Sequence, residues 1–415
     1  MNFIVKIFLA TLLAFVLSGC LGMQDENGWT TDTKDEFIEI LKKDTYASIC
    51  NSQSLATDAI KSENSRLMKE MLIVYVQNLA NSCIDLEALQ TFEKAQKSQN
   101  ISTKLVPYLQ NVNPADIVFQ LKAKLPIVKI LEPYIPTMPQ FSKLTAFYTM
   151  HKNDPIVTNE IRNALRMSIE RIKLMKQEIG ENYVLINIPE FKFRLIENNQ
   201  TALSFGVVTG KTTMQTPIFS SSLKYIVMNP PWNIPDSIAR KSIIPAMLRN
   251  PYSLKRRGIV IHKTYDLNSK KINRRSVNWK PYVGGKGYVP YKFIQVASRK
   301  NGLGRVKFIF PNHFAVYMHD TQSKSLFKRK SRAFSHGCVR LSKPTELLNY
   351  LVLNYTNKPI EAMQEEYDSL KTHYVKIIKP LNVHTAYLTA YMDENNTLRI
   401  FNDVYGLDKT QKLNF

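Results

Sequence analysis

The sequence predicts an α+β protein in which a helical amino-terminal domain precedes a mostly β domain. Between about residues 34 and 180, apolar side chains recur at helical spacing; Leu67, Met71 and Val74, for example, fall near one face. From Tyr183 onward the apolar residues alternate with a period of two, which is typical of half-buried strands. Because 415 residues exceed one average domain, we expect at least two units with full cores.

The predicted domain boundaries follow changes in composition. Residues 21–33 are polar and predict a flexible tether, residues 34–180 a helical scaffold domain, and residues 181–415 the β domain. An irregular insert rich in Lys, Arg, Tyr and Gly interrupts the β domain at about residues 233–292. Asn198-Asn199 supplies the turn of one predicted hairpin.

The first 20 residues have the pattern of a secretory signal. A short basic start precedes an apolar run over residues 7–17, which is too short to cross a bilayer of about 30 Å as a helix. The run ends in Leu17-Ser18-Gly19-Cys20, which resembles a bacterial lipobox, so we expect Cys20 to be lipidated. The expected location is therefore the periplasm of a Gram-negative bacterium, as a membrane-anchored lipoprotein. A plain cleaved signal and an uncleaved anchor are the alternatives.

The formal net charge of +22 indicates an anionic partner. Lys and Arg are spread over the whole length, so we expect a basic surface rather than a basic tail. Nucleic acid, an anionic membrane face and an anionic cell-wall polymer all fit such a surface. Export disfavours nucleic acid, so the expected contacts are the cell wall and, through the lipid anchor, the membrane.

The cysteines and histidines indicate whether the chain forms a disulfide or binds a metal. Cys50 and Cys83 lie in the helical region of an exported chain, where a disulfide is one expectation. Two buried free thiols are the other, because the sequence gives no Cα separation. The histidines lack ligand spacing, so we predict no metal site and no cofactor.

One motif carries the predicted chemistry: Ser335-His336-Gly337-Cys338-Val339-Arg340, with His319 a short loop upstream. A cysteine attacks as its thiolate and needs a base nearby, so Cys338 is the candidate nucleophile and His319 the candidate general base and acid. Backbone N–H groups around Gly337 and Cys338 are expected to form an oxyanion hole, because Gly allows close backbone approach. A helix with Ser342 as its N-cap is expected to follow directly and to stabilise the thiolate through its dipole.

These residues resemble the signature of the YkuD-type L,D-transpeptidases, which is a His, a loop of about this length, and then Ser/Thr-His-Gly-Cys followed by an apolar residue and Asn or Arg. The likeness covers about residues 125–410, and its YcbB-like branch is indicated by segments 187–191, 208–217, 229–235 and 403–408. The resemblance implies a mostly β catalytic domain in which the insert forms a capping subdomain.

The resemblance also implies a reaction on the bacterial cell wall. Cys338 would attack the bond before the terminal D-Ala of a peptidoglycan tetrapeptide stem, and an amine of a second stem would resolve the acyl-enzyme into a 3→3 crosslink. Donor and acceptor stems are then the expected partners. The insert, with its glycines, is a candidate lid over the substrate.

Other residues near the motif have two interpretations each. His336 either assists the thiolate or packs in the turn, and Arg340 either binds a stem carboxylate or holds the loop in a salt bridge. Tyr317 faces either core or cleft, and Trp232 is either a pocket wall or a core anchor. We expect four residues to bind substrate: Arg340, Tyr317, Trp232 and Ser335.

Other functions stay open at this stage. Water in place of the amine would make the protein an L,D-carboxypeptidase, and a different amine would make it another acceptor-exchange enzyme of the same fold. No motif specifies the acceptor. A catalytically idle wall-binding lipoprotein would not need His319 and Cys338 together. A papain-like protease is disfavoured, because there the cysteine precedes the histidine in the chain.

Overall fold

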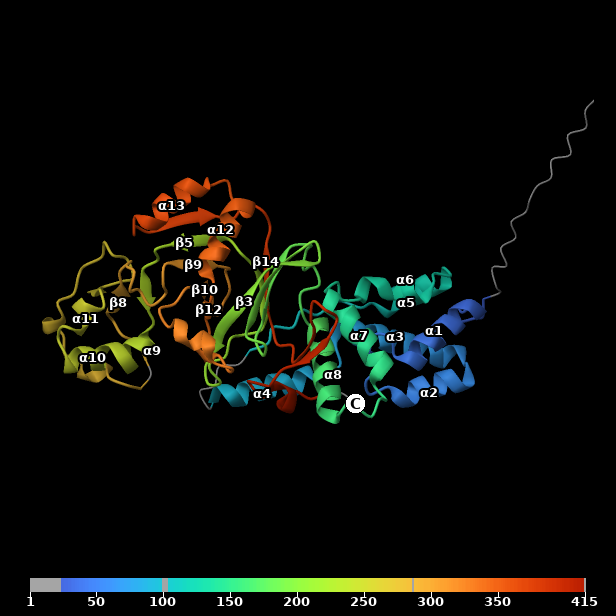
Figure 1. The fold of residues 1–415 in the computed structure, drawn as a ribbon. Coiled ribbons are helices and arrows are strands. Elements are labelled where there is room, and N and C mark those ends of the chain that lie inside the picture. The colour runs from blue at the N-terminus through green and yellow to red at the C-terminus, as the bar shows by residue number, and fades with distance from the viewer. Residues whose placement is uncertain (1–23, 99–103, 286, 414–415) are drawn as a thin grey trace, which may run out of the picture.

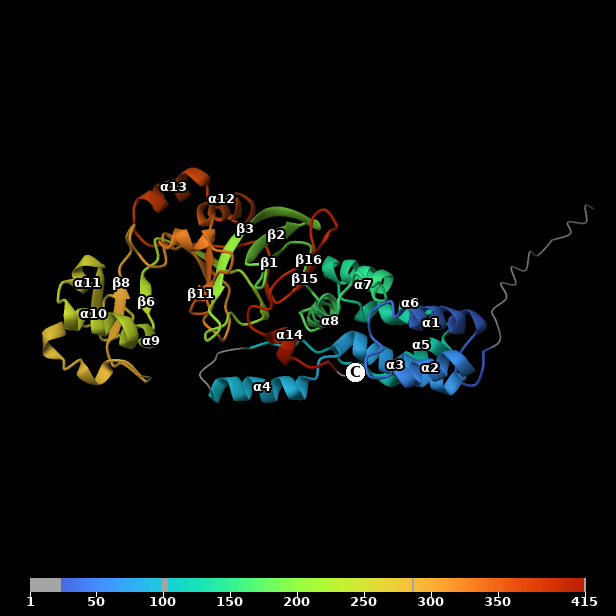
Figure 2. The same ribbon diagram turned by 60° about the horizontal axis from the view of Figure 1, so that its bottom comes forward.

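The computed structural model describes residues 24–98, 104–285 and 287–413. Figure 1 shows three parts in a row: a small cap at one end, a β domain in the middle and a helical domain at the other end. The view in Figure 2 has the same order of parts. The helical domain and the β domain together give the predicted α+β class.

The helical domain forms because amphipathic segments with good caps pack their apolar faces together. Thr30, Asn64, Asn113 and Thr158 each accept a hydrogen bond from a backbone N–H in the first turn of a helix. The largest apolar cluster of the described residues lies among these helices. The helices are α1 (Thr31–Lys43), α2 (Gln53–Ser62), α3 (Ser65–Asn81), α4 (Leu86–Ser98), α5 (Pro114–Lys122), α6 (Ile127–Leu131), α7 (Pro139–His151) and α8 (Asn159–Lys173).

The predicted tether is wrong for the part of it that the structure describes. Trp29 is 1% exposed and stacks on Phe37 of α1 with ring centroids 5.8 Å apart. Its indole N–H donates to the Ser65 carbonyl, and Thr30 caps α1. Polar composition concealed a single aromatic side chain that anchors this segment to the helical core. The signal segment and Cys20 lie outside the described residues.

A large mixed sheet forms the β domain and presents the candidate site. Its strand order is β13-β5-β9-β10-β12-β3-β2-β1-β14-β4, and β11 pairs with β3. Helix α12 (Pro344–Tyr355) buries Leu347, Leu351 and Val352 in the core of this domain, and α13 (Ile360–Asp368) follows. The strands are β1 (Tyr183–Asn187), β2 (Lys192–Glu197), β3 (Gln200–Gly210), β4 (Phe219–Ser222), β5 (Tyr225–Met228), β9 (Val306–Ile309), β10 (Met318–His319), β11 (Ala333–Ser335), β12 (Val339–Leu341), β13 (His373–Lys376) and β14 (Asn382–Ala386).

The insert folds as a unit with its own apolar core, and we call residues 232–295 the cap. Its antiparallel sheet has the order β6-β8-β7, and buried Trp279 and Phe293 contribute to its core. The strands and longer helices of the cap are β6 (Trp232–Ile234), β7 (Ile259–His262), β8 (Lys292–Gln295), α9 (Asp236–Ile238), the π-helical turn η2 (Ala239–Ile243), α10 (Ile244–Arg249) and α11 (Ser253–Arg256).

The end of the chain returns to the helical domain. Hairpin β15 (Ala390–Met392) and β16 (Leu398–Ile400) joins the main helical core, and the Gln140 side chain hydrogen-bonds both the N–H and the carbonyl of Met392. Beyond it, α14 (Leu407–Thr410) carries Asp408, which pairs with buried Arg171 at 2.6 Å. The helical domain is therefore completed by β15, β16 and α14, which follow the β domain in the chain.

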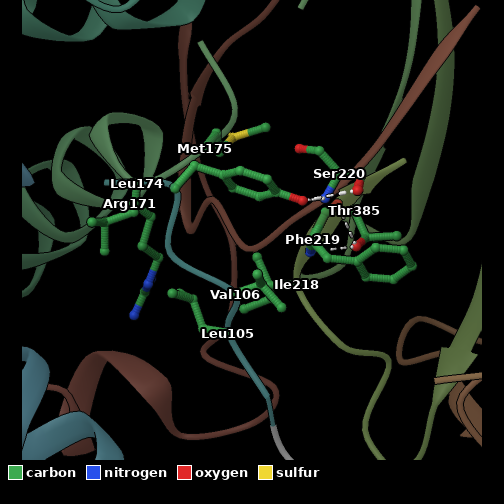
Figure 3. A pocket seen from close by; sticks show the side chains of 10 residues that line it. Leu105, Val106, Arg171, Leu174, Met175, Ile218, Phe219, Ser220 and Thr385 are labelled. Atoms are coloured by element: carbon green, nitrogen blue, oxygen red, sulfur yellow. Dashed lines mark hydrogen bonds between the residues drawn. The ribbon is translucent and has the colours of Figure 1, made fainter. Parts of the chain in front are cut away.

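The seam between these two domains is closely packed. Figure 3 shows a cavity there, lined by Leu105, Arg171 and Leu174 on one side and Ile218 and Phe219 on the other. Its volume of about 10 Å³ corresponds to one water molecule, so this cavity offers no room for a substrate.

A disulfide between Cys50 and Cys83, with Cα atoms 5.9 Å apart, ties the loop after α1 to the end of α3. The bond closes 33 residues of chain.

Replacing both cysteines by alanine is expected to lower the free energy of unfolding by about 3–4 kcal/mol, through the freedom that the unfolded chain regains. Urea denaturation followed by circular dichroism measures this, with reductant as the control. Reductant should destabilise the wild type and leave the double variant unchanged; equal stability of both proteins without reductant would contradict the prediction.

No helix in the described ranges is long and apolar enough to cross a membrane.

Candidate functional site

Strand register brings the predicted catalytic residues onto one face of the sheet. His319 of β10 lies opposite Arg340 of β12 in a parallel pair and opposite Lys307 of β9 in an antiparallel pair. Tyr317 and Cys338 come just before these strands. The Tyr317 ring centroid lies 5.6 Å from that of His319 and 3.8 Å from Lys307 Nζ, and the Tyr317 carbonyl accepts the N–H of Val339, the residue after Cys338, at 3.1 Å. Lys307, Tyr317, His319, Cys338 and Arg340 therefore form one cluster, although up to 33 residues separate them.

Cys338 lies in the bend that leads into β12, not at the start of a helix. Helix α12 begins only at Pro344, its N-cap is Lys343, and no side chain caps it. The predicted Ser342 cap and the predicted dipole at the cysteine are both wrong, because the strand pairing of residues 339–341 intervenes. The thiol must be activated by groups on the sheet itself.

The described neighbours of Cys338 are Tyr317, Lys307, Arg340 and the carbonyl of Ala315. Its Sγ lies 3.9 Å from the Ala315 oxygen, and it is the free cysteine among the described residues. Burial raises the pKa of the thiol, while hydrogen bonds from the backbone and hydroxyl of Tyr317 and the charges of Lys307 and Arg340 act to lower it. Burial prevails, so the resting side chain is a thiol and a base is needed to ionise it.

His319 is buried and fixed as a neutral base. It is 5% exposed, and its Nδ1–H donates to the Asp320 carbonyl oxygen at 2.5 Å. Burial, helped by the charge of Arg340, lowers the pKa of His319 to about 4, although the Asp320 and Leu303 carbonyls oppose the shift. The Asp320 carbonyl can only accept a hydrogen bond, so Nδ1 carries the proton of the neutral ring. Nε2 is therefore the basic nitrogen.

No direct hydrogen bond joins His319 to Cys338 in the described part of the chain. Tyr317 lies with its ring centroid 5.6 Å from that of His319 and interacts with the Cys338 sulfur through its hydroxyl. Burial and the proximity of Cys338 raise the pKa of Tyr317 far above its ordinary value, so the phenol stays protonated. Tyr317 therefore faces the site and not the core.

The turn before Cys338 is built by its own polar groups. Ser335 is buried, its Oγ donates to the Cys338 carbonyl at 2.5 Å, and it accepts the Gly337 N–H at 3.1 Å. Gly337 has φ +110°, which requires glycine, and its carbonyl accepts from Thr216 Oγ1 at 2.8 Å. These bonds fix the direction in which the Cys338 side chain leaves the backbone.

Two predicted roles in this turn are wrong for the resting structure. The Gly337 N–H is engaged by Ser335, so it is not free to bind an oxyanion. The Ser335 hydroxyl is engaged within the turn as well, so it does not face a substrate. The N–H of Cys338, the other predicted donor, has no hydrogen-bond partner in the described ranges and remains the candidate donor for an oxyanion.

The remaining predicted residues are placed as follows. His336 is exposed beside the motif, and Arg340 is half-buried with a buried Nε that lacks a hydrogen-bond partner. Trp232 lies in β6 of the cap, packs on the cap core, and approaches Gly302 so closely that a Cβ there would lie 3.0 Å from its ring. Trp232 thus joins the cap to the β domain and does not contact Cys338.

Lys307 is a site residue that sequence reasoning missed. Its Nζ lies 3.8 Å from the centroid of the Tyr317 ring, and its charge favours the Cys338 thiolate. Only the antiparallel register of β9 and β10, which the sequence does not reveal, places Lys307 beside His319.

Replacing Lys307 with methionine is expected to slow alkylation of Cys338 by iodoacetamide at pH 8 roughly three- to tenfold, because the thiolate loses a favourable charge. Intact-mass time courses across a pH series measure the rate. Lys307→Arg keeps the charge and should restore most of it. Identical pH profiles for wild type and Lys307→Met would show that the lysine does not act on the thiol.

Among the described residues, no three His, Cys, Asp or Glu side chains gather as a metal site.

Comparison with known proteins finds a family model that covers this site. Residues 181–361, which include His319 and Cys338, match the model of the YkuD family, described as an L,D-transpeptidase catalytic domain. A curated protein of Haemophilus influenzae named "Putative L,D-transpeptidase" is 29% identical over 251 residues, which is 60% of this chain and 49% of that protein. The chain thus spans about half the length of this curated relative.

Solved L,D-transpeptidases are more distant. One from Mycobacterium smegmatis is 14% identical with a TM-score of 0.22, and the match covers 49% of this chain and 58% of that chain. One from Enterococcus faecium is 11% identical with a TM-score of 0.17, over 49% of this chain and 50% of that chain.

Proposed function

Residues 181–361 match the model of the YkuD family of L,D-transpeptidase catalytic domains, and from this match we propose that the protein forms 3→3 crosslinks in peptidoglycan through an acyl-enzyme on Cys338. The observation that carries the proposal is the single cluster of Cys338, His319, Tyr317, Lys307 and Arg340 on one face of the sheet. A nucleophile, a neutral base and cations occur together there, as acyl transfer requires.

Acylation would begin with the thiol. His319 Nε2 takes the proton as Sγ attacks the carbonyl carbon that precedes the terminal D-Ala of a donor stem. The negative charge that develops on the carbonyl oxygen is stabilised by the Cys338 N–H and by nearby cations. The C–N bond then breaks, the leaving D-Ala nitrogen takes the proton from His319, and a thioester remains on Cys338.

Crosslinking would follow the same path in reverse. An amine of a second stem attacks the thioester carbon and gives its surplus proton to His319, and the Cys338 thiolate leaves. The new amide joins two stems, and the thiol is restored by the proton held on His319. Water in place of the amine releases a shortened stem, which is the L,D-carboxypeptidase alternative.

The test is incubation of the purified protein with disaccharide-tetrapeptide, followed by mass spectrometry of the products. Crosslinked dimers that the Cys338→Ala variant does not form support the proposal. Tripeptide monomers alone would establish the carboxypeptidase. Unchanged substrate with the wild type would refute both enzymatic functions and leave the wall-binding scaffold.

The cellular location is a separate proposal. The lipobox-like segment at Cys20 supports a lipid anchor in the periplasm, and the cap supports the YcbB-like branch. Radiolabelled palmitate incorporation into the wild type, lost in Cys20→Ala, would test the anchor. Labelling that persists in the variant would exclude Cys20 as its site.

A further inference from the structure

The turn that carries Cys338 is held from outside by Thr216, which lies in the loop between β3 and β4. Thr216 is 1% exposed, and its hydroxyl donates to the Gly337 carbonyl at 2.8 Å. The same hydroxyl oxygen accepts the N–H of Gly210, the last residue of β3, at 2.9 Å. One buried hydroxyl group therefore links the end of β3 to the residue immediately before Cys338.

The Gly337 carbonyl and the Cys338 N–H belong to one peptide group. This peptide bond is planar and trans, so the two groups point in opposite directions, and a hydrogen bond to the carbonyl also sets the direction of the N–H. Gly337 does not set it alone, because glycine adopts a φ of +110° and many other values at little cost. Thr216 thus orients the candidate oxyanion donor through the backbone.

Tyr405, which follows β16 in the chain, holds Thr216 in place. Its hydroxyl donates to the Gly210 carbonyl at 2.7 Å and accepts the N–H of Thr216 at 3.2 Å. A Cβ on Gly210 would lie 2.2 Å from the Met214 carbonyl oxygen, so the close approach of these segments requires glycine. Because these groups are buried, removing a partner leaves a polar atom unsatisfied.

The hydrogen bonds continue from Tyr405 to the helical domain. The N–H of Tyr405 donates to the Tyr387 hydroxyl at 2.7 Å, and this hydroxyl donates to Asp403 at 2.6 Å. Asp403 also accepts the N–H of Asp408 at 3.0 Å, and the Asp408 side chain pairs with Arg171 of α8. Figure 2 shows α14 beside α8, on the side towards the β domain. An unbroken series of hydrogen bonds therefore joins α8 to the catalytic turn.

We propose that Thr216 and Tyr405 are positioning residues, which orient the Cys338 N–H towards the oxyanion and anchor the catalytic turn to the helical domain. The inference rests on the proposed function, because acyl transfer is the reaction that creates the oxyanion. Tyr405 fixes Thr216, and Thr216 fixes the Gly337 carbonyl. The negative charge develops only as Cys338 attacks, so a misdirected N–H slows the reaction without weakening substrate binding.

The experiment compares Thr216→Val, which removes the hydroxyl, with Thr216→Ser, which keeps it. On disaccharide-tetrapeptide we expect Thr216→Val to lower kcat about 10–100-fold and to leave KM within twofold. The loss is smaller than the roughly 10²–10³-fold that removal of an oxyanion donor costs, because the N–H is misdirected and not removed. Thr216→Ser should stay within threefold of the wild type. Tyr405→Phe, which loses the hydroxyl that holds Thr216, should lower kcat about three- to tenfold.

Two control variants lose comparable hydroxyl groups outside this network. Buried Thr145 of α7 donates to the Phe141 carbonyl at 2.9 Å, and Tyr350 of α12 donates to Glu197 at 2.7 Å. Thr145→Val and Tyr350→Phe should keep kcat within twofold, with circular dichroism to verify that all variants fold. The inference is overturned if Thr216→Val loses less than threefold in kcat, if its loss lies in KM, or if Thr216→Ser loses as much.

If the wild type converts no stem peptide, the proposed function fails, and amide hydrogen exchange decides the inference alone. The N–H of Gly337 donates to Ser335 within the turn, so exchange over residues 335–341 reports how firmly the turn is held. At least tenfold faster exchange there in Thr216→Val, with wild-type rates in Thr216→Ser and Thr145→Val, supports the inference. Wild-type rates in Thr216→Val refute it.

Discussion

Replacing His319 with glutamine is expected to lower kcat/KM for acyl transfer by about 10²–10⁴-fold, the usual contribution of a positioned general base. The resting Cys338 is a thiol, because burial outweighs the groups that favour its thiolate, so the reaction needs a proton acceptor. His319 is neutral at pH 7, since its pKa lies at about 4, and it is therefore ready to accept.

The same pKa sets the sign of the pH dependence. His319 accepts a proton only in its neutral form, so the acid limb of kcat/KM should lie near pH 4 and not near the value of about 6.5 that an unperturbed histidine gives. Above the acid limb the rate should stay level while Cys338 is a thiol, because the proton that His319 passes to the leaving nitrogen comes from that thiol. A limb near pH 6.5 would show that His319 is not held in its buried site.

The control is His151→Gln, which removes a half-exposed imidazole of α7 far from the motif in sequence and should leave kcat/KM within twofold. Steady-state kinetics over pH 4–9 on all three proteins, with circular dichroism to verify folding, complete the experiment. Less than a threefold loss in His319→Gln would assign the base to another group, and Tyr317, which contacts the sulfur, would be the first to examine.

The second large effect is expected in the helical domain, where Glu170→Gln should lower the free energy of unfolding by about 3–5 kcal/mol. Glu170 is fully buried, and its Oε1 lies 3.1 Å from both Arg166 and Lys173. Its Oε2 accepts the N–H of Cys83 at 2.7 Å. The substitution keeps the shape of the side chain but removes the charge, so two buried cations lose the carboxylate between them.

Lys173 makes this cost unavoidable. It is fully buried, and its Nζ also donates to the Ala47 carbonyl at 2.7 Å. Burial already lowers the pKa of Lys173, and Glu170 acts against that shift. Without the carboxylate, Lys173 must either stay charged with less compensation or lose its proton.

Glu178→Gln is the matched control, because its side chain is 90% exposed and lies 3.7 Å from Lys176. Surface pairs of this kind contribute about 0–1 kcal/mol, so the control should unfold almost as the wild type does. Urea unfolding monitored by far-ultraviolet circular dichroism at pH 7 measures both. A loss below about 1 kcal/mol in Glu170→Gln would mean that water or a rearranged partner replaces the carboxylate.

Local patterns explain which parts of the fold the sequence predicts. Helical spacing and strand alternation are properties of short segments, and so is the Asn198-Asn199 turn, in which both residues have positive φ as the hairpin requires. The role of Trp29 was missed because one aromatic residue in a polar segment has no periodicity to reveal it. The return of β15 and β16 to the helical core was missed because it joins segments more than 200 residues apart.

The residues of the candidate site also fall into those that a local sequence pattern predicts and those that it does not. Cys338 and His319 are predictable because both lie in one motif with a characteristic spacing. Lys307 comes from a strand whose pairing with β10 the sequence does not reveal, and a lone lysine in a basic chain carries no signal. The engagement of the Gly337 N–H by Ser335 depends on side-chain orientation within the turn, which spacing alone does not give.

The placement of β15, β16 and α14 on the helical domain also bears on the order in which the protein is made. The amino-terminal helices emerge from the ribosome long before Tyr391 and Met392, which belong to their core, and before Asp408, the partner of Arg171. The core of the helical domain can therefore close only after residues 390–408 have been synthesised. Until then the helical domain of the nascent chain stays incompletely packed and open to chaperones.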